Sequence, residues 1–248
     1  MIEQQDQGHI RTLRLARPPA NALNGELLSA LGAAVARAPD EGARALVLTG
    51  SGAMFSAGLD VMALAVMDLP ALRAFLGTFF DCLERLAGSK IPVVAAINGH
   101  SPAGGAVLAL YCDRRIMARG EARIGLNEVQ VGLYPGPLIH QVLVRTIGAR
   151  LAGECLTTGA MLLPQEAVAV GFVDELADDA EAAARAWLER ILKLPPIAYA
   201  ATRALVRRDL IELMARARSS DQEALLDAWT GPETRAALAA LMARLAKR

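Results

Sequence analysis

The stretch IPVVAAINGHSPAGGAVLALYC, from Ile91 to Cys112, decides the fold. It contains no residue that is charged at pH 7 with histidine neutral. A membrane-spanning helix needs about 20 predominantly apolar residues, so the length of this stretch invites a membrane interpretation. That interpretation fails because the run is broken by Pro92, Asn98, Gly99, Pro102, Gly104 and Gly105.

The same stretch divides into a strand, a turn and a helix. Ile91–Ile97 is rich in β-branched residues and predicts a buried strand, Asn98–Ala103 predicts a turn, and Gly104 opens a buried helix that continues through Leu110. The first N–H groups of a helix lack intrahelical acceptors, and the helix dipole favours negative charge there. The turn could therefore bind the oxygen of a polarised carbonyl group.

A second turn of the same kind lies earlier in the chain. The strand predicted at Ala43–Thr49 runs into GSGAMFSAGLD, which ends at Asp60 where a new helical pattern begins. If the fold brings the turns near Gly58 and Gly104 together, each offers one N–H group to a single oxygen. Such an oxyanion hole would stabilise an enolate, and one donor is typically worth about 2.7–4 kcal/mol. The alternative is two ordinary tight turns.

Strands and helices alternate along the rest of the chain as far as Leu176, and the remainder is almost wholly helical. This alternation predicts an α/β fold with right-handed crossovers and helices packed on a sheet. The helical part begins near Ala180 and breaks at Pro195–Pro196 and at Gly231–Pro232. The other expected elements are strands at His9–Ala16, Arg115–Ala118 and Val173–Leu176, and helices at Gly25–Arg37 (capped by Asn24), Leu69–Leu86, Leu138–Ile147, Ala149–Thr158 and Pro164–Val170.

Composition excludes several classes of function. Lysine and arginine total 26, as do aspartate and glutamate, so no net charge favours nucleic acid or an acidic membrane. The three cysteines are far apart and odd in number, which argues against a disulfide framework, against a metal site and for a reducing compartment. The N-terminal stretch lacks the basic start and apolar run of a signal peptide, so we expect a cytoplasmic protein.

Glu128 is the candidate base. Its neighbours Ile124, Leu126, Val129 and Val131 are apolar, and desolvation in a partly apolar pocket raises the pKa of a carboxyl group and improves it as a base. The alternative is a solvated or salt-bridged loop glutamate.

Other polar residues are assigned structural roles. GSGAMF fails the G-x-G-x-x-G pattern, and no serine lies in G-x-S-x-G, so nucleotide and serine-hydrolase sites are weakly supported. His9, His100 and His140 are interpreted as structural. The run Arg207, Arg208 and Asp209 is interpreted as a solvated helix face.

Four motifs together resemble the crotonase (enoyl-CoA hydratase/isomerase) superfamily. They are FSAGLD at 55–60, INGHSPAGGAVLALYCD at 97–113, IGLNEVQVG at 124–132 and LLPQEAVAVGFVDEL at 162–176. SPAGG followed by IGLNE is most similar to the mitochondrial-type 3,2-trans-enoyl-CoA isomerases. The resemblance implies a spiral of ββα units in a core at residues 1–195. It also implies a helical region at 196–248 for trimerisation or as a lid, a homotrimer or hexamer, and an acyl-CoA substrate with no separate cofactor.

The resemblance also implies site residues. The family's oxyanion donors fall on the backbone N–H groups of Leu59 and Gly104, and its catalytic glutamate falls on Glu128. Its acyl-CoA contacts at the first turn fall on Ala57, Gly58, Leu59, Asp60 and Val61, and the acyl chain points toward the helical tail.

Two departures from the family bear on the reaction. Hydratases usually carry two glutamates, and the first falls here on Val107, which cannot transfer a proton. One base suffices for isomerisation, so the resemblance favours an isomerase over a hydratase, a thioester hydrolase or a non-catalytic acyl-CoA-binding protein. After Gly132 the chain reads LYPGPLIHQ, which differs from the isomerases; Tyr134 and His140 could line that region, and the acyl-chain preference is open.

Overall fold

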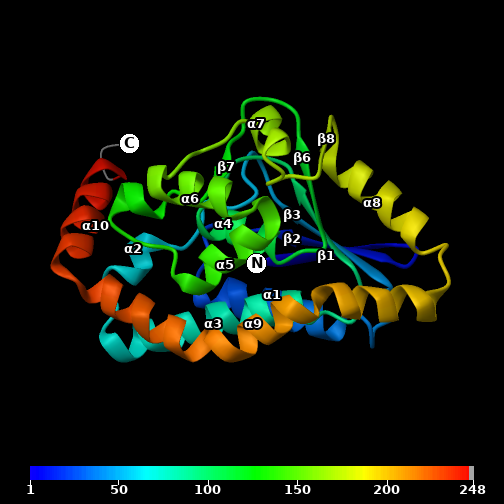
Figure 1. Ribbon diagram of the computed structural model, residues 1–248, viewed down its shortest axis with the longest axis horizontal. Helices are drawn as coiled ribbons and strands as arrows, with labels where there is room; N and C mark the ends of the chain where they lie inside the picture. The colour runs from blue at the N-terminus through cyan, green and yellow to red at the C-terminus, as the bar shows by residue number, and fades with distance from the viewer. Residues whose placement is uncertain (246–248) are drawn as a thin grey trace.

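A six-stranded, mostly parallel sheet carries the fold in the computed structural model, which describes residues 1–245 (Figure 1). The strand order is β1-β2-β3-β4-β6-β8. Only the first pair, β1 with β2, is antiparallel. The strands are β1 (Ile2–Gln7), β2 (Ile10–Leu15), β3 (Ala45–Gly50), β4 (Val93–Ile97), β6 (Arg114–Ala118) and β8 (Glu175–Ala177).

The sequence analysis predicted every strand of this sheet except β1. Five of the six residues of β1 are exposed, and the strand lies at the sheet edge, so it has no buried apolar alternation that a sequence pattern could reveal. The central strands differ. Every residue of β3 and β4 is buried, as expected for parallel strands that are covered on both faces.

Helices cover both faces of the sheet. On one face lie α1 (Gly25–Arg37) and α3 (Leu69–Ala87), which pack against each other, and on the other face lies α8 (Ala180–Ile191), which packs on β3, β4 and β6 (Figure 1). The predicted cap of α1 is confirmed, because Asn24 Oδ1 accepts a hydrogen bond from the N–H of Leu27 at 2.9 Å.

The remaining elements are short strands and helices in the middle of the chain. They are α2 (Val61–Leu64), the two-stranded sheet of β5 (Ser101–Pro102) and β7 (Ile124–Gly125), α4 (Gly104–Leu110), the 3₁₀ helix η1 (Glu128–Val131), α5 (Pro137–Ile147), α6 (Ala149–Thr158) and α7 (Pro164–Ala169). The predicted helix opening at Gly104 is therefore confirmed. The two-residue strand β5 inside the predicted turn was not expected.

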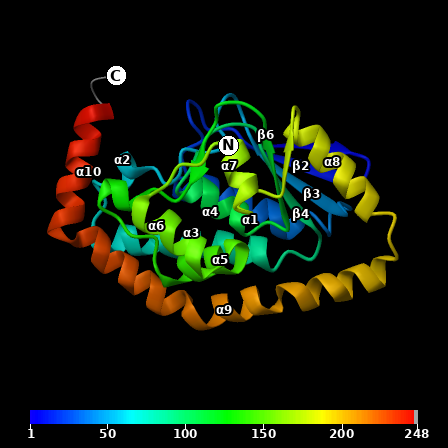
Figure 2. The same ribbon diagram turned by 45° about the horizontal axis from the view of Figure 1, so that its top comes forward.

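Two helices form the C-terminal region, and they begin at Pro196 and Pro232, where the sequence predicted breaks. Helix α9 (Pro196–Thr230) crosses α3 and α5 along one side of the core, and α10 (Pro232–Leu245) turns away at its end (Figure 2). None of the helices within residues 1–245 has the length and apolarity needed to cross a membrane.

The interpretation of the charge run on α9 as a solvated face was wrong for Arg207. Its side chain is 6% exposed and donates hydrogen bonds to the carbonyl oxygens of Leu86, Ala87 and Tyr111. Its Nη1 also lies 3.1 Å from Asp113 Oδ1. These carbonyls are at the C-terminal ends of α3 and α4, where carbonyl groups lack intrahelical donors and the helix dipole favours a cation.

We predict that Arg207→Met lowers the free energy of unfolding by roughly 3 kcal/mol, because buried carbonyl oxygens and Asp113 lose a charged donor. The exposed neighbour Arg208 provides the matched control, and Arg208→Met should change stability by less than about 0.5 kcal/mol. Urea unfolding measures both. Equal destabilisation by the two variants would contradict the structural role of Arg207.

Candidate active site

The loops that follow β3 and β4 lie against each other. The two strands pair in parallel with Thr49 opposite Ala96, so their loops leave the same edge of the sheet. The N–H of Phe55 then donates to the carbonyl oxygen of His100 at 3.0 Å, and Met54 and His100 form a parallel bridge. The fold thus joins the two turns that the sequence analysis singled out.

Two backbone N–H groups converge where these loops meet. A Cβ atom added at Gly104 would lie 3.2 Å from the amide nitrogen of Leu59, and one added at Gly58 would lie 3.1 Å from the amide nitrogen of Gly104. Within residues 1–245, neither the N–H of Leu59 nor that of Gly104 has a hydrogen-bond acceptor. Two free donors in so small a space can bind one oxygen atom between them.

Neighbouring bonds fix the orientation of Leu59. The carbonyl oxygen of Gly58 accepts from the N–H of Leu23 at 2.8 Å, and the N–H of Asp60 donates to the carbonyl oxygen of Leu23 at 3.0 Å. Gly58 has φ +83°, a conformation that glycine adopts without cost. Ala103, just before Gly104, is held at φ +45° and ψ −119°, which is strained for a residue with a Cβ.

Asn21 anchors the first loop from a distant part of the chain. It is 1% exposed, and its Nδ2 donates to the carbonyl oxygens of Ser51, Met54 and Phe55. Its Oδ1 accepts from the N–H of Arg17 at 3.1 Å. The sequence gives no sign of this role, because an asparagine shortly after two prolines has the pattern of an ordinary loop residue.

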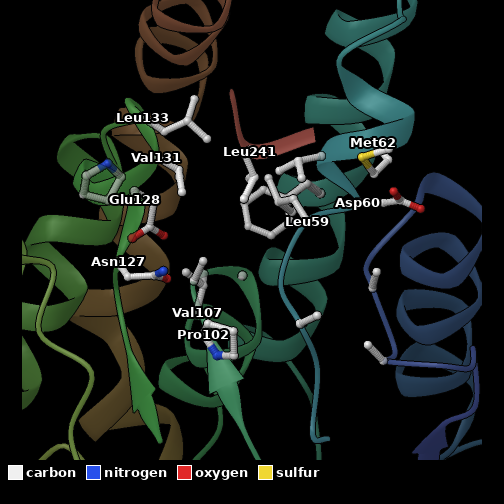
Figure 3. Close-up of a pocket in the computed structure, with 18 of the residues that line it drawn as sticks. Leu59, Asp60, Met62, Pro102, Val107, Asn127, Glu128, Val131, Leu133 and Leu241 are labelled. Carbon is white, nitrogen blue, oxygen red and sulfur yellow. The ribbon is translucent and has the colours of Figure 1, made fainter. Parts of the chain in front are cut away.

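A cavity of about 610 Å³ opens beside the two N–H groups (Figure 3). Of the site residues expected from the sequence, all except Gly58 line it; Gly58 lies between the two turns instead. Its lining includes Arg17, Ala57, Leu59, Asp60, Val61, Phe79, Gly104, Val107, Asn127, Glu128, Tyr134, Leu225 and Trp229.

Glu128 is the first residue of η1 and points into this cavity beside Asn127 (Figure 3). Its Oε2 and the Oδ1 of Asn127 are buried without a hydrogen-bond partner in the described chain. Desolvation raises the pKa of Glu128 to about 7. It has no salt-bridge partner among residues 1–245. The salt-bridged alternative is therefore wrong, and Glu128 is half-buried rather than fully solvated.

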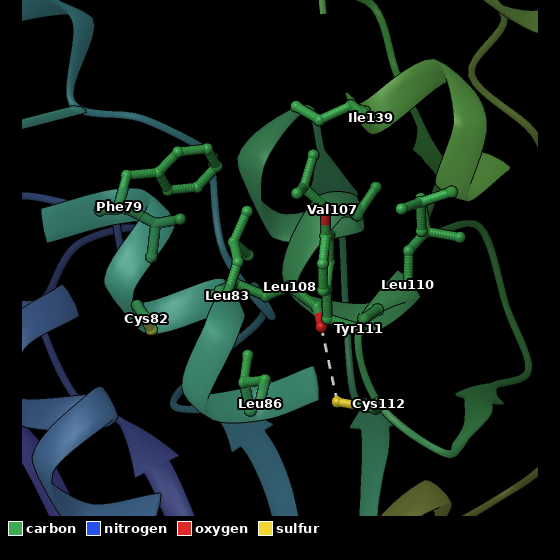
Figure 4. Close-up of a cluster of buried hydrophobic side chains, with 14 of the residues drawn as sticks. Phe79, Cys82, Leu83, Leu86, Val107, Leu108, Leu110, Tyr111, Cys112 and Ile139 are labelled. Atoms are coloured by element: carbon green, nitrogen blue, oxygen red, sulfur yellow. Dashed lines mark hydrogen bonds between the residues drawn. The ribbon is translucent and has the colours of Figure 1, made fainter. Parts of the chain in front are cut away.

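Val107 faces the same cavity from α4. Its side chain is 1% exposed and belongs to an apolar cluster with Leu83, Ile139 and the ring of Tyr111 (Figure 4). The wall across from Glu128 is therefore apolar, and it offers neither a proton donor nor an acceptor at this position.

Asp60 is the second carboxylate that lines the cavity, but it is already engaged. Its Oδ2 lies 2.7 Å from Nη2 of Arg17, and its Oδ1 accepts from the N–H of Ala63 at 3.1 Å as the N-cap of α2. Arg17 also donates to the carbonyl oxygen of Ala22 at 3.0 Å. Among the carboxylates that line the cavity in the described chain, Glu128 alone is unpaired.

The other polar candidates lie at or beyond the edge of the site. Tyr134 lines the cavity and is 41% exposed, whereas His140 is exposed on α5 and does not line it. His100 is exposed, and its Nδ1 accepts from the N–H of Arg123 at 3.1 Å. The structural interpretation of His100 fits this contact.

Comparison with known proteins gives several relatives. The chain is 30% identical over 226 residues to the mitochondrial enoyl-CoA delta isomerase 1 of Rattus norvegicus, covering 89% of this chain and 78% of that protein. It is 37% identical over 210 residues to a putative enoyl-CoA hydratase of Thermus thermophilus, covering 82% of each chain. The structure of human mitochondrial delta3-delta2-enoyl-CoA isomerase superposes with a TM-score of 0.94 at 27% identity, covering 99% of this chain and 98% of that one.

The structural likeness confirms the crotonase-like fold that the sequence motifs indicated, including the C-terminal helical region. The family model described as enoyl-CoA hydratase/isomerase matches residues 5–241, nearly the whole chain. This protein therefore belongs to the enoyl-CoA hydratase/isomerase family.

Proposed function

We propose that the protein isomerises a 3-enoyl-CoA to the 2-trans-enoyl-CoA, with Glu128 as the single proton carrier. The observation that carries this proposal is that the cavity contains one carboxyl group without a salt-bridge partner among residues 1–245. Glu128 is half-buried, its Oε2 has no hydrogen-bond partner in the described chain and its pKa is raised to about 7, whereas Val107 on the same cavity wall carries no ionisable group. An isomerase needs one group that both removes and returns a proton.

In this proposal the thioester binds at the two converging loops. Its carbonyl oxygen accepts hydrogen bonds from the N–H groups of Leu59 and Gly104, which have no other acceptor within residues 1–245. Ala57, Asp60 and Val61 line the cavity beside this point and contact the substrate. Coenzyme A enters as part of the substrate, so the reaction requires no separate cofactor.

The proton chemistry follows from this placement. The two N–H groups stabilise negative charge on the thioester oxygen, which acidifies the α carbon. The Glu128 carboxylate removes the α proton, and the electron pair passes into a dienolate whose charge rests on the thioester oxygen. The Glu128 carboxyl group then returns the proton to the γ carbon, and the double bond moves from position 3 to position 2. The base is regenerated, and no atom is gained or lost.

Hydration is the second candidate, favoured by the relative described as a putative hydratase. Hydration requires one group to activate water and a proton to reach the α carbon. Across from Glu128 the apolar Val107 can do neither. A crotonyl-CoA assay in labelled water separates the two candidates, because robust uptake of the label into a 3-hydroxyacyl product would replace the isomerase proposal.

We predict that Glu128→Gln lowers kcat for a 3-enoyl-CoA by about 10²- to 10⁴-fold, the usual contribution of a general base. Glutamine keeps the size of the side chain but cannot accept the proton. The affinity for a saturated acyl-CoA, measured by calorimetry, should stay within a few-fold of wild type. Activity close to the wild-type value would contradict the proposed mechanism.

We predict a pH dependence that reports the raised pKa of Glu128. The ionised carboxylate is the active form, so kcat/KM should rise with pH and level off above an apparent pKa of about 7. Below that pH it should fall about tenfold per unit. A glutamate with an ordinary pKa of about 4.3 would give a flat profile down to pH 5. Such a flat profile would contradict the assignment.

We further propose a homotrimer-based assembly in which the helical region from residue 196 contributes the contacts. Ile197, Leu205 and Val206 of α9 are apolar side chains that are 85%, 61% and 60% exposed. Their exposure on one helix supports a contact with another copy of the chain.

A further inference from the structure

Trp229, near the C-terminal end of α9, lies between two cavities. It lines the 610 Å³ cavity that contains Glu128, and it also lines a second cavity of about 440 Å³ between the α2–α3 segment and α10. It is the one residue common to both linings within residues 1–245. The side chain is only 5% exposed, so its indole ring fills the space between the cavities.

Trp229 lies beside other apolar residues of the first cavity. The thioester site is marked by the N–H groups of Leu59 and Gly104. The charged pair of Arg17 and Asp60 lines one part of the cavity, and the apolar rings of Phe79 and Trp229 line another. The polar pantetheine arm of coenzyme A suits the charged part, and an acyl chain suits the apolar part.

Part of the second cavity is lined by buried leucines. Leu64, Leu72 and Leu238 line it and are 2%, 5% and 3% exposed. The carboxylate of Asp68 in its wall is engaged, because its Oδ1 accepts from the N–H of Ala71 at 2.8 Å as the N-cap of α3. The wall also includes the exposed side chains of Val66 and Arg235. An acyl chain that passed Trp229 would contact the three buried leucines on one side of this cavity.

We propose that Trp229 sets the acyl-chain length that this protein accepts, and that the second cavity is the latent site for the distal end of a longer chain. The inference rests on the proposed function only in taking an acyl-CoA as the ligand. Short and medium chains end against the indole ring. Its removal joins the two cavities and admits chains that the wild-type protein excludes.

The test measures binding of a ladder of saturated straight-chain acyl-CoAs, from butyryl to palmitoyl, by calorimetry. In the wild type, affinity should rise with chain length and then stop rising. In Trp229→Ala it should continue to rise over several further carbons, by about fourfold for each additional buried methylene, which corresponds to about 0.8 kcal/mol. Trp229→Leu keeps an apolar side chain for folding and should extend the rise by fewer carbons.

Two leucines provide matched controls. Leu225→Ala enlarges only the first cavity and Leu238→Ala only the second, so neither should move the chain length at which affinity stops rising. An unchanged plateau in folded Trp229→Ala and Trp229→Leu overturns the proposal, as does an equal shift in Leu238→Ala. The acyl chains used are saturated and cannot be isomerised. A shifted plateau therefore supports the role of Trp229 even if the protein shows no isomerase activity. Absence of any acyl-CoA binding by the wild type overturns this inference and the proposed function together.

Discussion

The close backbone contact between the loops after β3 and β4 is the constraint on which the rest of the site depends. Adjacent parallel strands bring the loops to one edge of the sheet, and a Cβ atom at Gly58 would crowd the amide nitrogen of Gly104 at 3.1 Å. Asn21 holds one loop through three carbonyl oxygens, and Ala103 is kept in a strained conformation by its surroundings. A pair of donors fixed in this way needs no reorganisation when charge develops on a bound oxygen.

The electrostatics of the cavity are simple because most charged groups in its wall neutralise each other. Arg17 and Asp60 form an ion pair, so they leave little net charge near the thioester site. Desolvation then dominates at Glu128, where no cation within residues 1–245 compensates the carboxylate, and its pKa rises. The apolar side chain of Val107 in the same wall adds no charge that would lower this pKa. In our account the reaction is decided by this one unpaired acid rather than by the fold, since the relatives that share the family include enzymes described as isomerases and as hydratases.

Features with a local cause could be predicted from the sequence, and features that depend on distant contacts could not. The Asn24 cap, the helix opening at Gly104 and the breaks in the helical tail follow from neighbouring residues. The apolar neighbours of Glu128 likewise indicated that its carboxyl group is partly desolvated. By contrast, Arg207 in a charged run gave no sign that α9 would cross the ends of α3 and α4. Nothing near Trp229 in the sequence indicates that it separates two cavities.

The central claim is that one carboxyl group, that of Glu128, removes the proton from the α carbon and returns it to the γ carbon. Two N–H groups stabilise the negative charge on the thioester oxygen during this transfer. The most direct measurement is a crystal structure with an unreactive acyl-CoA analogue. The account predicts that the thioester oxygen lies about 2.7–3.1 Å from the nitrogens of Leu59 and Gly104. It also predicts that the Glu128 carboxylate lies within about 3.5 Å of both the α and the γ carbon. A second ionisable side chain at either carbon, or a thioester oxygen bound elsewhere, would contradict it.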